Sequence, residues 1–290
     1  MSIAIEIQRL NTAKADIKAA IEAKGVTVPS NATIDTYDDY VSQISGGGGG
    51  GSTADTEALK GMIDRNITGI TIPSGVTFIA EYAFANCMGL ETVNSNTLGE
   101  ANIPSGVIGI GSYAFYYCRS LTSVTIPDSV TSLGSYAFSY CDGLISCTIG
   151  SGVTSIGTST FNACSSLTSI NIPSGVTEIG NNTFYVCTSL TSVTIPDTVT
   201  SIGKYAFQAC SLTSVTIPDS VTSIDNYAFR SCSSLTSITV KATTPPTLGN
   251  SSVFLNTNDC PIYVPSGSVD TYKAANNWST YASRIQAIPT

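Results

Sequence analysis

A phenylalanine recurs along the middle of the chain at an almost constant spacing, and this period constrains the fold more than any other feature. The intervals between successive members are 31, 23, 23, 23, 23 and 22 residues. Such a fixed period is the sequence signature of a solenoid in which each repeat forms one coil, so we expect about seven coils of about 23 residues. A cysteine follows each phenylalanine three residues later. The phenylalanines are Phe84, Phe115, Phe138, Phe161, Phe184, Phe207 and Phe229, and the cysteines are Cys87, Cys118, Cys141, Cys164, Cys187, Cys210 and Cys232.

The residues between the phenylalanines divide each repeat into three parts. In one repeat, Leu121, Val124 and Ile126 alternate with hydroxyl residues, which predicts a half-buried strand. Pro127 follows the strand, because proline cannot donate to a sheet ladder. A Val-x-x-Ile/Leu pair then predicts a second short extended piece, and Tyr-Ala-Phe-x-x-Cys predicts a tight bend. Eight extra residues around 94–102 are expected to bulge from one coil.

The consensus Leu-Thr-Ser-Val-Thr-Ile-Pro-Asp-Ser-Val-Thr-Ser-Ile-Gly-x-Tyr-Ala-Phe-x-x-Cys resembles the BspA-type leucine-rich repeat over residues 67–240. This resemblance implies a right-handed, gently curved solenoid used for adhesion or recognition, with no catalytic residue to transfer. The expected fold class is a mainly β repeat solenoid with short helical turns, preceded by a small N-terminal helical segment and closed by a C-terminal cap.

The flanking segments divide the chain into five parts. Residues 1–45 are expected to form a helical attachment or oligomerisation segment. Residues 46–53 contain six consecutive glycines and form a flexible linker, because glycine has almost no preferred conformation. Residues 54–66 are expected to cap the N-terminal end of the solenoid at 67–240, and residues 241–290 its C-terminal end, since a stack of repeats needs a cover at each end.

The first helical segment carries an apolar seam at heptad spacing, interrupted by Lys14. One interpretation is that this helix folds onto its own neighbour at 34–44. The other is self-association as a homotrimer, because Ile-rich core positions favour trimers in coiled coils. The seam consists of Ile3, Ile7, Leu10, Ile17 and Ile21.

The leader followed by polyglycine resembles the short helical leaders of bacteriophage tail and fibre proteins. The chain also begins without the basic and apolar segments of a secretory signal. This resemblance implies a virion structural protein that attaches to other virion proteins through residues 1–45 and to a bacterial surface glycan or protein through the solenoid. The alternative is a bacterial cell-surface or secreted adhesin that binds host protein or glycan.

Composition argues against several other classes of function. The chain contains no histidine, the usual base partner of a Ser or Cys nucleophile, so we expect no enzymatic activity and no cofactor. Its net charge is −8 and no Lys/Arg cluster occurs, which argues against nucleic acid as a partner. No apolar run approaches the roughly 20 residues that span a bilayer, so no membrane insertion is expected.

The cysteine column has two interpretations. Neighbouring strands lie about 4.8 Å apart, a spacing that does not forbid disulfides or a metal array. Equivalent cysteines on adjacent coils nevertheless point in parallel, which favours buried free thiols that pack as small hydrophobes. Cys147 and Cys260 lie outside the column, and the sequence leaves their reactivity open.

Two outward surfaces are candidates for ligand binding. Tyrosines enlarge the aromatic surface near the bends and are good binding anchors when partly exposed, although a regular tyrosine column also serves packing. Hydroxyl and amide residues recur along the main strands, where they also suit a merely solvated sheet. The candidate residues are Tyr116, Tyr117, Tyr140 and Tyr185 for the first surface, and Thr168, Asn171, Thr191, Thr194, Thr213 and Thr216 for the second.

Overall fold

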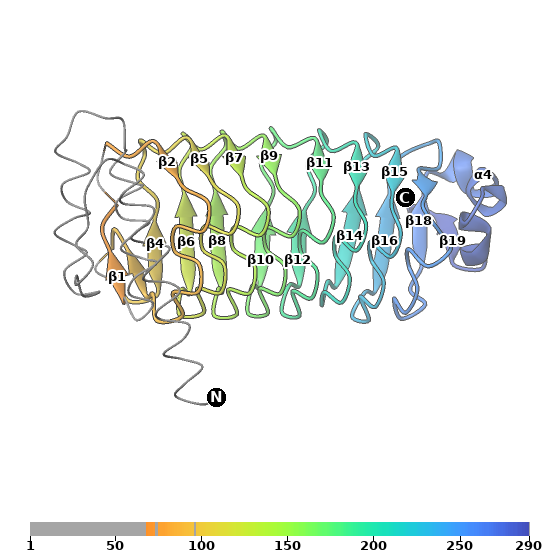
Figure 1. The fold of residues 1–290 in the computed structure, drawn as a ribbon. Helices are drawn as coiled ribbons and strands as arrows, with labels where there is room; N and C mark the ends of the chain where they lie inside the picture. The colour runs from red at the N-terminus through yellow and green to blue at the C-terminus, as the bar shows by residue number, and fades with distance from the viewer. Residues whose placement is uncertain (1–67, 73–74, 96, 290) are drawn as a thin grey trace, which may run out of the picture.

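The computed structural model describes residues 68–72, 75–95 and 97–289. These residues form one stack of coils, and Figure 1 shows the coils following one another from β1 at one end to the helix α4 at the other. Equivalent residues of neighbouring coils pair in parallel, as in Ser123 with Ser146. The expected repeat solenoid with a period of about 23 residues is therefore confirmed.

The first side of each coil is a strand in a parallel sheet. In β6, Val124 and Ile126 are buried and Thr125 is exposed, so the predicted half-buried alternation is present. The strands of this side are β1 (Gly69–Ile70), β3 (Thr92–Val93), β4 (Glu100–Asn102), β6 (Ser123–Ile126), β8 (Ser146–Ile149), β10 (Ser169–Asn171), β12 (Ser192–Thr194), β14 (Ser214–Ile217), β16 (Ser237–Val240), β18 (Ile262–Val264) and β19 (Ile285–Ala287).

The second side follows the proline turn and carries shorter strands. The turn is closed by the N–H of Val130, which donates to the carbonyl of Pro127 at 3.1 Å. These strands also pair in parallel with their neighbours. They are β2 (Phe78–Ile79), β5 (Gly109–Ile110), β7 (Ser132–Leu133), β9 (Ser155–Ile156), β11 (Glu178–Ile179), β13 (Ser201–Ile202), β15 (Ser223–Ile224) and β17 (Thr247–Leu248).

The third side carries the Tyr-Ala-Phe-x-x-Cys segment as a run of linked turns. Within one segment, Tyr136 and Tyr140 both adopt the left-handed conformation with φ of 59°, which costs roughly 1–2 kcal/mol for a residue with a Cβ. The N–H of Phe138 donates to Thr160 O of the next coil at 2.9 Å, and that of Tyr140 to Asn162 O at 2.8 Å. Hydrogen bonds between coils thus hold a backbone that would otherwise be unfavourable.

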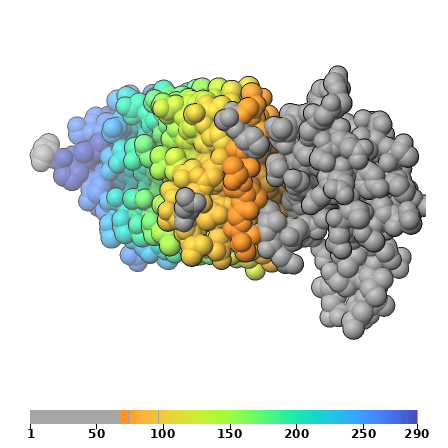
Figure 2. Space-filling model, turned by 90° about the vertical axis from the view of Figure 1, so that its left-hand side faces the viewer, coloured from red at the N-terminus to blue at the C-terminus, as the bar shows by residue number. Residues whose placement is uncertain are grey.

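The core consists of columns of identical side chains that run along the stack. Phe138 and Phe161 stack with ring centroids 5.6 Å apart, and Phe161 and Phe184 with centroids 5.7 Å apart. All three rings are fully buried. Figure 2 shows the outside of the same stack, with the coils as successive bands of colour packed against one another. Each coil is thus buried chiefly by its two neighbours.

The eight-residue insertion does more than bulge from a coil. Residues 94–99 connect β3 to β4, and the two strands pair in parallel with Val93 opposite Ala101. On the second side, β2 pairs directly with β5. The insertion therefore adds one strand to the first side alone, and Asn94 fixes its start through two side-chain hydrogen bonds with the backbone of Ile72, at 2.6 and 2.8 Å.

The stack continues past residue 240, where the C-terminal cap was expected to begin. Strand β17 pairs with β15, and β18 pairs with β16. Phe254 extends the phenylalanine column, with its ring centroid 5.6 Å from that of Phe229. One further coil thus follows the last Tyr-Ala-Phe motif, although it lacks that motif.

The end of the stack is covered by a short helix and two 3-10 turns. The helix α4 (Val269–Ala274) lies between the turns Ser266–Ser268 and Trp278–Tyr281. The helix ends because Ala275 is extended, with ψ of 149°. Trp278, Tyr281 and Ile285 of the expected C-terminal cap are buried against the last coil. The predicted segments 1–45, 46–53 and 54–66, with the seam from Ile3 to Ile21, lie outside the described residues.

A glycine at the corner after the second side gives a direct test of coil-to-coil contact. A Cβ added to Gly134 would approach the backbone carbon of Gly111 within 2.5 Å, so we expect Gly134→Ala to lower the free energy of unfolding by about 1–3 kcal/mol. Gly180 holds the equivalent position, and its nearest neighbour would lie 3.5 Å away. Gly180→Ala should therefore change stability by no more than about 1 kcal/mol, and in the stabilising direction. Urea unfolding followed by circular dichroism compares the two, and equal losses would contradict the argument.

Candidate functional site

The hydroxyl side is the outward surface of the first-side sheet, and it holds all six hydroxyl and amide candidates in exposed positions. The hydroxyls of one column are committed to the fold. Thr168 Oγ1 donates to Ile145 O at 3.3 Å, Thr191 Oγ1 to Thr168 O at 3.2 Å, and Thr213 Oγ1 to Thr191 O at 3.4 Å. These hydroxyls therefore act first as links between coils.

A second column of the hydroxyl side consists of Asn171, Thr194 and Thr216, whose polar groups face solvent. Asn171 lies opposite Thr194 in the register of β10 and β12. The side chains of Asn171, Thr194 and Thr216 are exposed and make no hydrogen bond within the part of the chain that the structure describes. They form a flat, uncharged strip that offers a ligand no anchoring pocket.

The tyrosine side is the outward surface of the linked turns. Tyr113 stacks on Tyr82 with centroids 4.8 Å apart and on Tyr136 with centroids 4.7 Å apart. Ser159 and Asn182 hold this position in the next two coils, and they divide the aromatic residues in two. The first tyrosine group is Tyr82, Tyr113, Tyr116, Tyr117, Tyr136 and Tyr140, and the second tyrosine group is Tyr185, Tyr205 and Tyr227.

Three of the four predicted tyrosines meet in the first group. Tyr117 and Tyr140 stack at 4.6 Å, and the ring of Tyr116 stands edge-on to both, at 4.7 and 5.8 Å. Partial burial raises the pKa of Tyr116. Tyr185 lies in the second group, where its ring is 6.0 Å from that of Tyr205. The structure thus places the four candidates on one side but not in one cluster.

Sequence reasoning missed the cations on the tyrosine side. Arg119 lies over Tyr117 at 4.8 Å, Lys204 over Tyr205 at 4.9 Å, and Arg230 over Tyr227 at 5.4 Å. These are all the lysines and arginines of residues 68–240. Each cation is within three residues of its tyrosine, a signal that is visible once the turns are known to share one surface. Cations and tyrosines of this kind stabilise each other by about 0.5–1 kcal/mol at exposed sites.

The cysteine column belongs to the core rather than to a site. All nine cysteines are buried, and none forms a disulfide within the described residues. Cys141 Sγ donates to Phe115 O at 3.1 Å and Cys187 Sγ to Phe161 O at 3.1 Å, so each thiol bonds the coil before it. Burial raises the pKa of both thiols to about 12, which keeps them protonated and unreactive at neutral pH. Their burial agrees with the interpretation of the column cysteines as packing thiols, and Cys147 and Cys260, whose reactivity the sequence left open, are buried as well.

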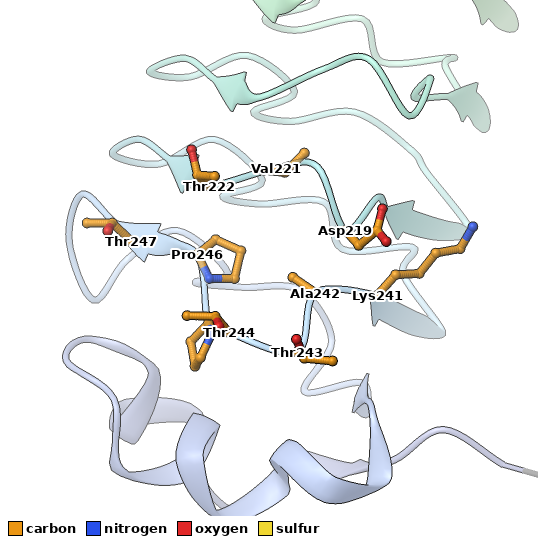
Figure 3. A pocket seen from close by; sticks show the side chains of 10 residues that line it. Asp219, Val221, Thr222, Lys241, Ala242, Thr243, Thr244, Pro246 and Thr247 are labelled. Atoms are coloured by element: carbon orange, nitrogen blue, oxygen red, sulfur yellow. The ribbon is translucent and has the colours of Figure 1, made fainter.

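A pocket of 410 Å³ lies where the last coil meets the cap. Figure 3 shows Asp219 and Lys241 at one end of it and Thr222 and Thr247 at the other. Cap residues fix one wall, because Trp278 Nε1 donates to the carbonyl of Pro246 at 2.8 Å. The pocket is open and lined mainly by threonine and proline, and it brings together none of the predicted residues.

The repeats match one family model along most of the chain. The model describes a BspA type leucine rich repeat region, and six copies match within residues 62–99, 94–210 and 164–274. The chain belongs to the BspA-type leucine-rich-repeat family. The resemblance found in the consensus repeat is therefore confirmed.

Several solved structures of leucine-rich-repeat proteins are similar to this chain. A leucine rich cell surface protein from Faecalibacterium prausnitzii is 29% identical over 70% of this chain, with a TM-score of 0.58. A leucine-rich repeat protein from Bacteroides ovatus is 30% identical over 71% of the chain, with a TM-score of 0.53. The match spans 65% and 56% of the length of these two proteins. The leucine rich repeat protein of T. pallidum is 28% identical, with coverage of 67% and 84% and a TM-score of 0.54.

A search of curated proteins finds no match to this BspA-type chain. Across residues 68–289, apart from the gaps given above, no helix is long and apolar enough to cross a membrane. In the same part of the chain, no cluster of three or more His, Cys, Asp or Glu side chains is suited to a metal ion.

Proposed function

We propose that the chain is a non-catalytic recognition protein of a bacterial cell surface that binds a surface glycan or protein through its tyrosine side. The similar protein from F. prausnitzii is a leucine rich cell surface protein, which favours the adhesin alternative over the virion protein. The observation that carries the proposal is the row of partly exposed tyrosines along one side of the coils, three of which have a cation over the ring.

The tyrosine side suits recognition better than the hydroxyl side. Partly exposed tyrosines combine an apolar ring with a hydroxyl and lose little conformational entropy on binding, because the rings are already held by stacking. The hydroxyl side offers no aromatic or charged residue at Asn171, Thr194 or Thr216. In its other column, the hydroxyls of Thr168 and Thr191 already donate hydrogen bonds to the preceding coil.

Binding of the labelled full chain to a panel of bacterial and host cells and to a glycan array tests the proposal. We expect Tyr185→Ala combined with Tyr205→Ala to weaken binding by about tenfold or more, since aromatic anchors carry most interface energy. Tyr117→Ala with Tyr140→Ala tests the first group in the same way. Thr194→Ala with Thr216→Ala is the control from the hydroxyl side. Loss of binding in that control alone would move the site to the hydroxyl side, and circular dichroism checks that each variant is folded.

Residues 1–45 are proposed to assemble the chain, as the homotrimer interpretation of the Ile3 to Ile21 seam suggests. Light scattering of the full chain and of a chain that begins at Ala54 tests this idea. We expect a trimer that becomes a monomer on truncation. The same mass per particle before and after truncation would contradict it. A virion role, with other virion proteins as partners of this segment, would then lose its sequence basis.

A further inference from the structure

We propose that the second tyrosine group is a site for an anionic saccharide, in which carboxylate groups of the sugar meet the cations Lys204 and Arg230 and a sugar ring packs on tyrosine. This inference rests on the proposed function and names its ligand class. We call the site the cationic tyrosine patch. It consists of Tyr185, Lys204, Tyr205, Gln208, Tyr227 and Arg230.

Three consecutive coils bring the patch together. The N–H of Val186 donates to Gln208 O and that of Ala209 to Arg230 O, both at 2.9 Å. These bonds place Tyr185, Gln208 and Arg230, which hold the same position in successive repeats, side by side on the tyrosine side. Three coils measure roughly 10–15 Å along the axis at about 4.8 Å per strand, a length that suits two or three sugar units.

The patch is positively charged although the chain is acidic. The net charge of the chain is −8, yet Lys204 and Arg230 form no ion pair within the described residues. Arg119, in the first tyrosine group, is instead paired with Asp142 at 3.2 Å. The carboxylate next in sequence to the patch, Asp225, accepts the N–H of Asn226 at 2.6 Å. Two unpaired cations therefore remain for an anion of the ligand.

Two buried polar atoms of the patch also have no partner. Gln208 Oε1 and Arg230 Nε are shielded from solvent and make no hydrogen bond. A buried polar atom without a partner costs about 1–3 kcal/mol. The first atom needs a donor and the second needs an acceptor, and a sugar hydroxyl supplies both once these side chains move apart to admit it.

These groups together select the ligand class. Carboxylates pair with the guanidinium of Arg230 and the ammonium of Lys204, and a hydroxyl can bond the two unpartnered atoms. The apolar face of a pyranose packs on tyrosine rings. A neutral sugar lacks the carboxylate. An acidic peptide has the carboxylate but no ring of hydroxyls beside it.

Titration calorimetry on the full chain with defined oligosaccharides tests the inference. The probes are trigalacturonate and sialyllactose, with maltotriose and lactose as neutral controls and hexaglutamate as the peptide control. We expect the acidic sugars to bind about tenfold more tightly than the neutral sugars and than the peptide. Raising NaCl from about 20 to about 150 mM should weaken the acidic sugars severalfold, because salt screens exposed charges.

Charge-removing variants assign the binding to the patch. Lys204→Gln with Arg230→Gln should weaken the binding of acidic sugars by about tenfold or more, the equivalent of about 1.4 kcal/mol or more. Lys273→Gln removes one positive charge at an exposed position of the cap helix and should leave the affinity within about twofold. Circular dichroism and thermal melting of each variant show whether the fold is kept.

The remaining outcomes overturn the inference in distinguishable ways. If no acidic sugar binds, or if the double variant binds it as the parent does, the patch is not the site. If hexaglutamate binds as tightly as the sugars, the ligand class is wrong. If cells still bind through Tyr185 and Tyr205 in either case, the proposed function stands and only this inference falls.

Discussion

Raising the pH from about 8 to about 11 is expected to unfold the solenoid. Burial raises the pKa of the core thiols, and for Cys141, Cys187 and Cys232 it does so to about 12, whereas an unfolded cysteine has a pKa of about 8.5. The pKa is raised in the same direction for Cys118, Cys147, Cys164 and Cys210, with burial as the largest cause in each.

The sign follows from which state loses protons first. Below about pH 8.5 both states hold the thiol protons and the full stability is present. Above it the unfolded chain releases protons that the folded chain keeps, so stability falls as the pH rises toward about 12. Seven such thiols give a slope of roughly 10 kcal/mol per pH unit. This is comparable to the total stability of a typical domain, about 5–15 kcal/mol.

Urea unfolding at several pH values, under reducing conditions, measures this slope. The Cys187→Ala variant is the internal control, because one fewer thiol should make the slope shallower by about 1.4 kcal/mol per pH unit. Its lower stability at neutral pH does not affect that comparison. Unfolding free energies that stay constant between about pH 8 and 11 would show that the core thiols are not protected as the structure indicates.

Replacing Phe161 by alanine is expected to lower the free energy of unfolding by about 3–5 kcal/mol. Phe161 is fully buried and stacks on Phe138 and on Phe184, so its loss opens a cavity in the middle of the column. The coils on both sides lose a neighbour, and the loss should also separate the unfolding of the two halves of the stack. Urea unfolding followed by circular dichroism measures both effects.

Phe78 provides a matched control for the same change. Its side chain is 48% exposed on the second side, so Phe78→Ala should cost no more than about 1 kcal/mol. If both variants lost the same stability, the phenylalanine column would not be the main support of the stack. If Phe161→Ala unfolded in a single step at all urea concentrations, the coils would be more strongly coupled than nearest-neighbour stacking implies.

The period of the sequence was enough to predict the solenoid, because one interval describes both the strand register and the columns in the core. The alternation around Val124 predicted which side chains point inward. The sequence did not predict that the insertion at 94–99 separates two paired strands. On the first side β3 pairs with β4, whereas on the second side β2 pairs directly with β5, and this difference depends on how the flanking coils pack. The coil at 241–264 was missed because it keeps Phe254 but replaces the Tyr-Ala-Phe motif.

The candidate residues were predicted to lie on the surface, and the structure places them there. Which of them contact one another could not be predicted from the sequence. The interruption of the tyrosine column at Ser159 and Asn182 is visible in the sequence, yet which rings touch depends on left-handed residues such as Tyr140. The cations Lys204 and Arg230 have different offsets from their tyrosines. No single spacing relates them, so their common surface emerges only when the coils are stacked.

Because each coil packs mainly on its two neighbours, the molecule can be lengthened or shortened in evolution by one whole coil at a time. Residues 121–132 and 212–223 have the same twelve-residue sequence, which is the kind of identity at which recombination within a gene duplicates or deletes a segment. Each coil gained would add about 4.8 Å of reach and would need no new core. The distance between an anchoring end and the cationic tyrosine patch can therefore be adjusted while the patch itself stays intact.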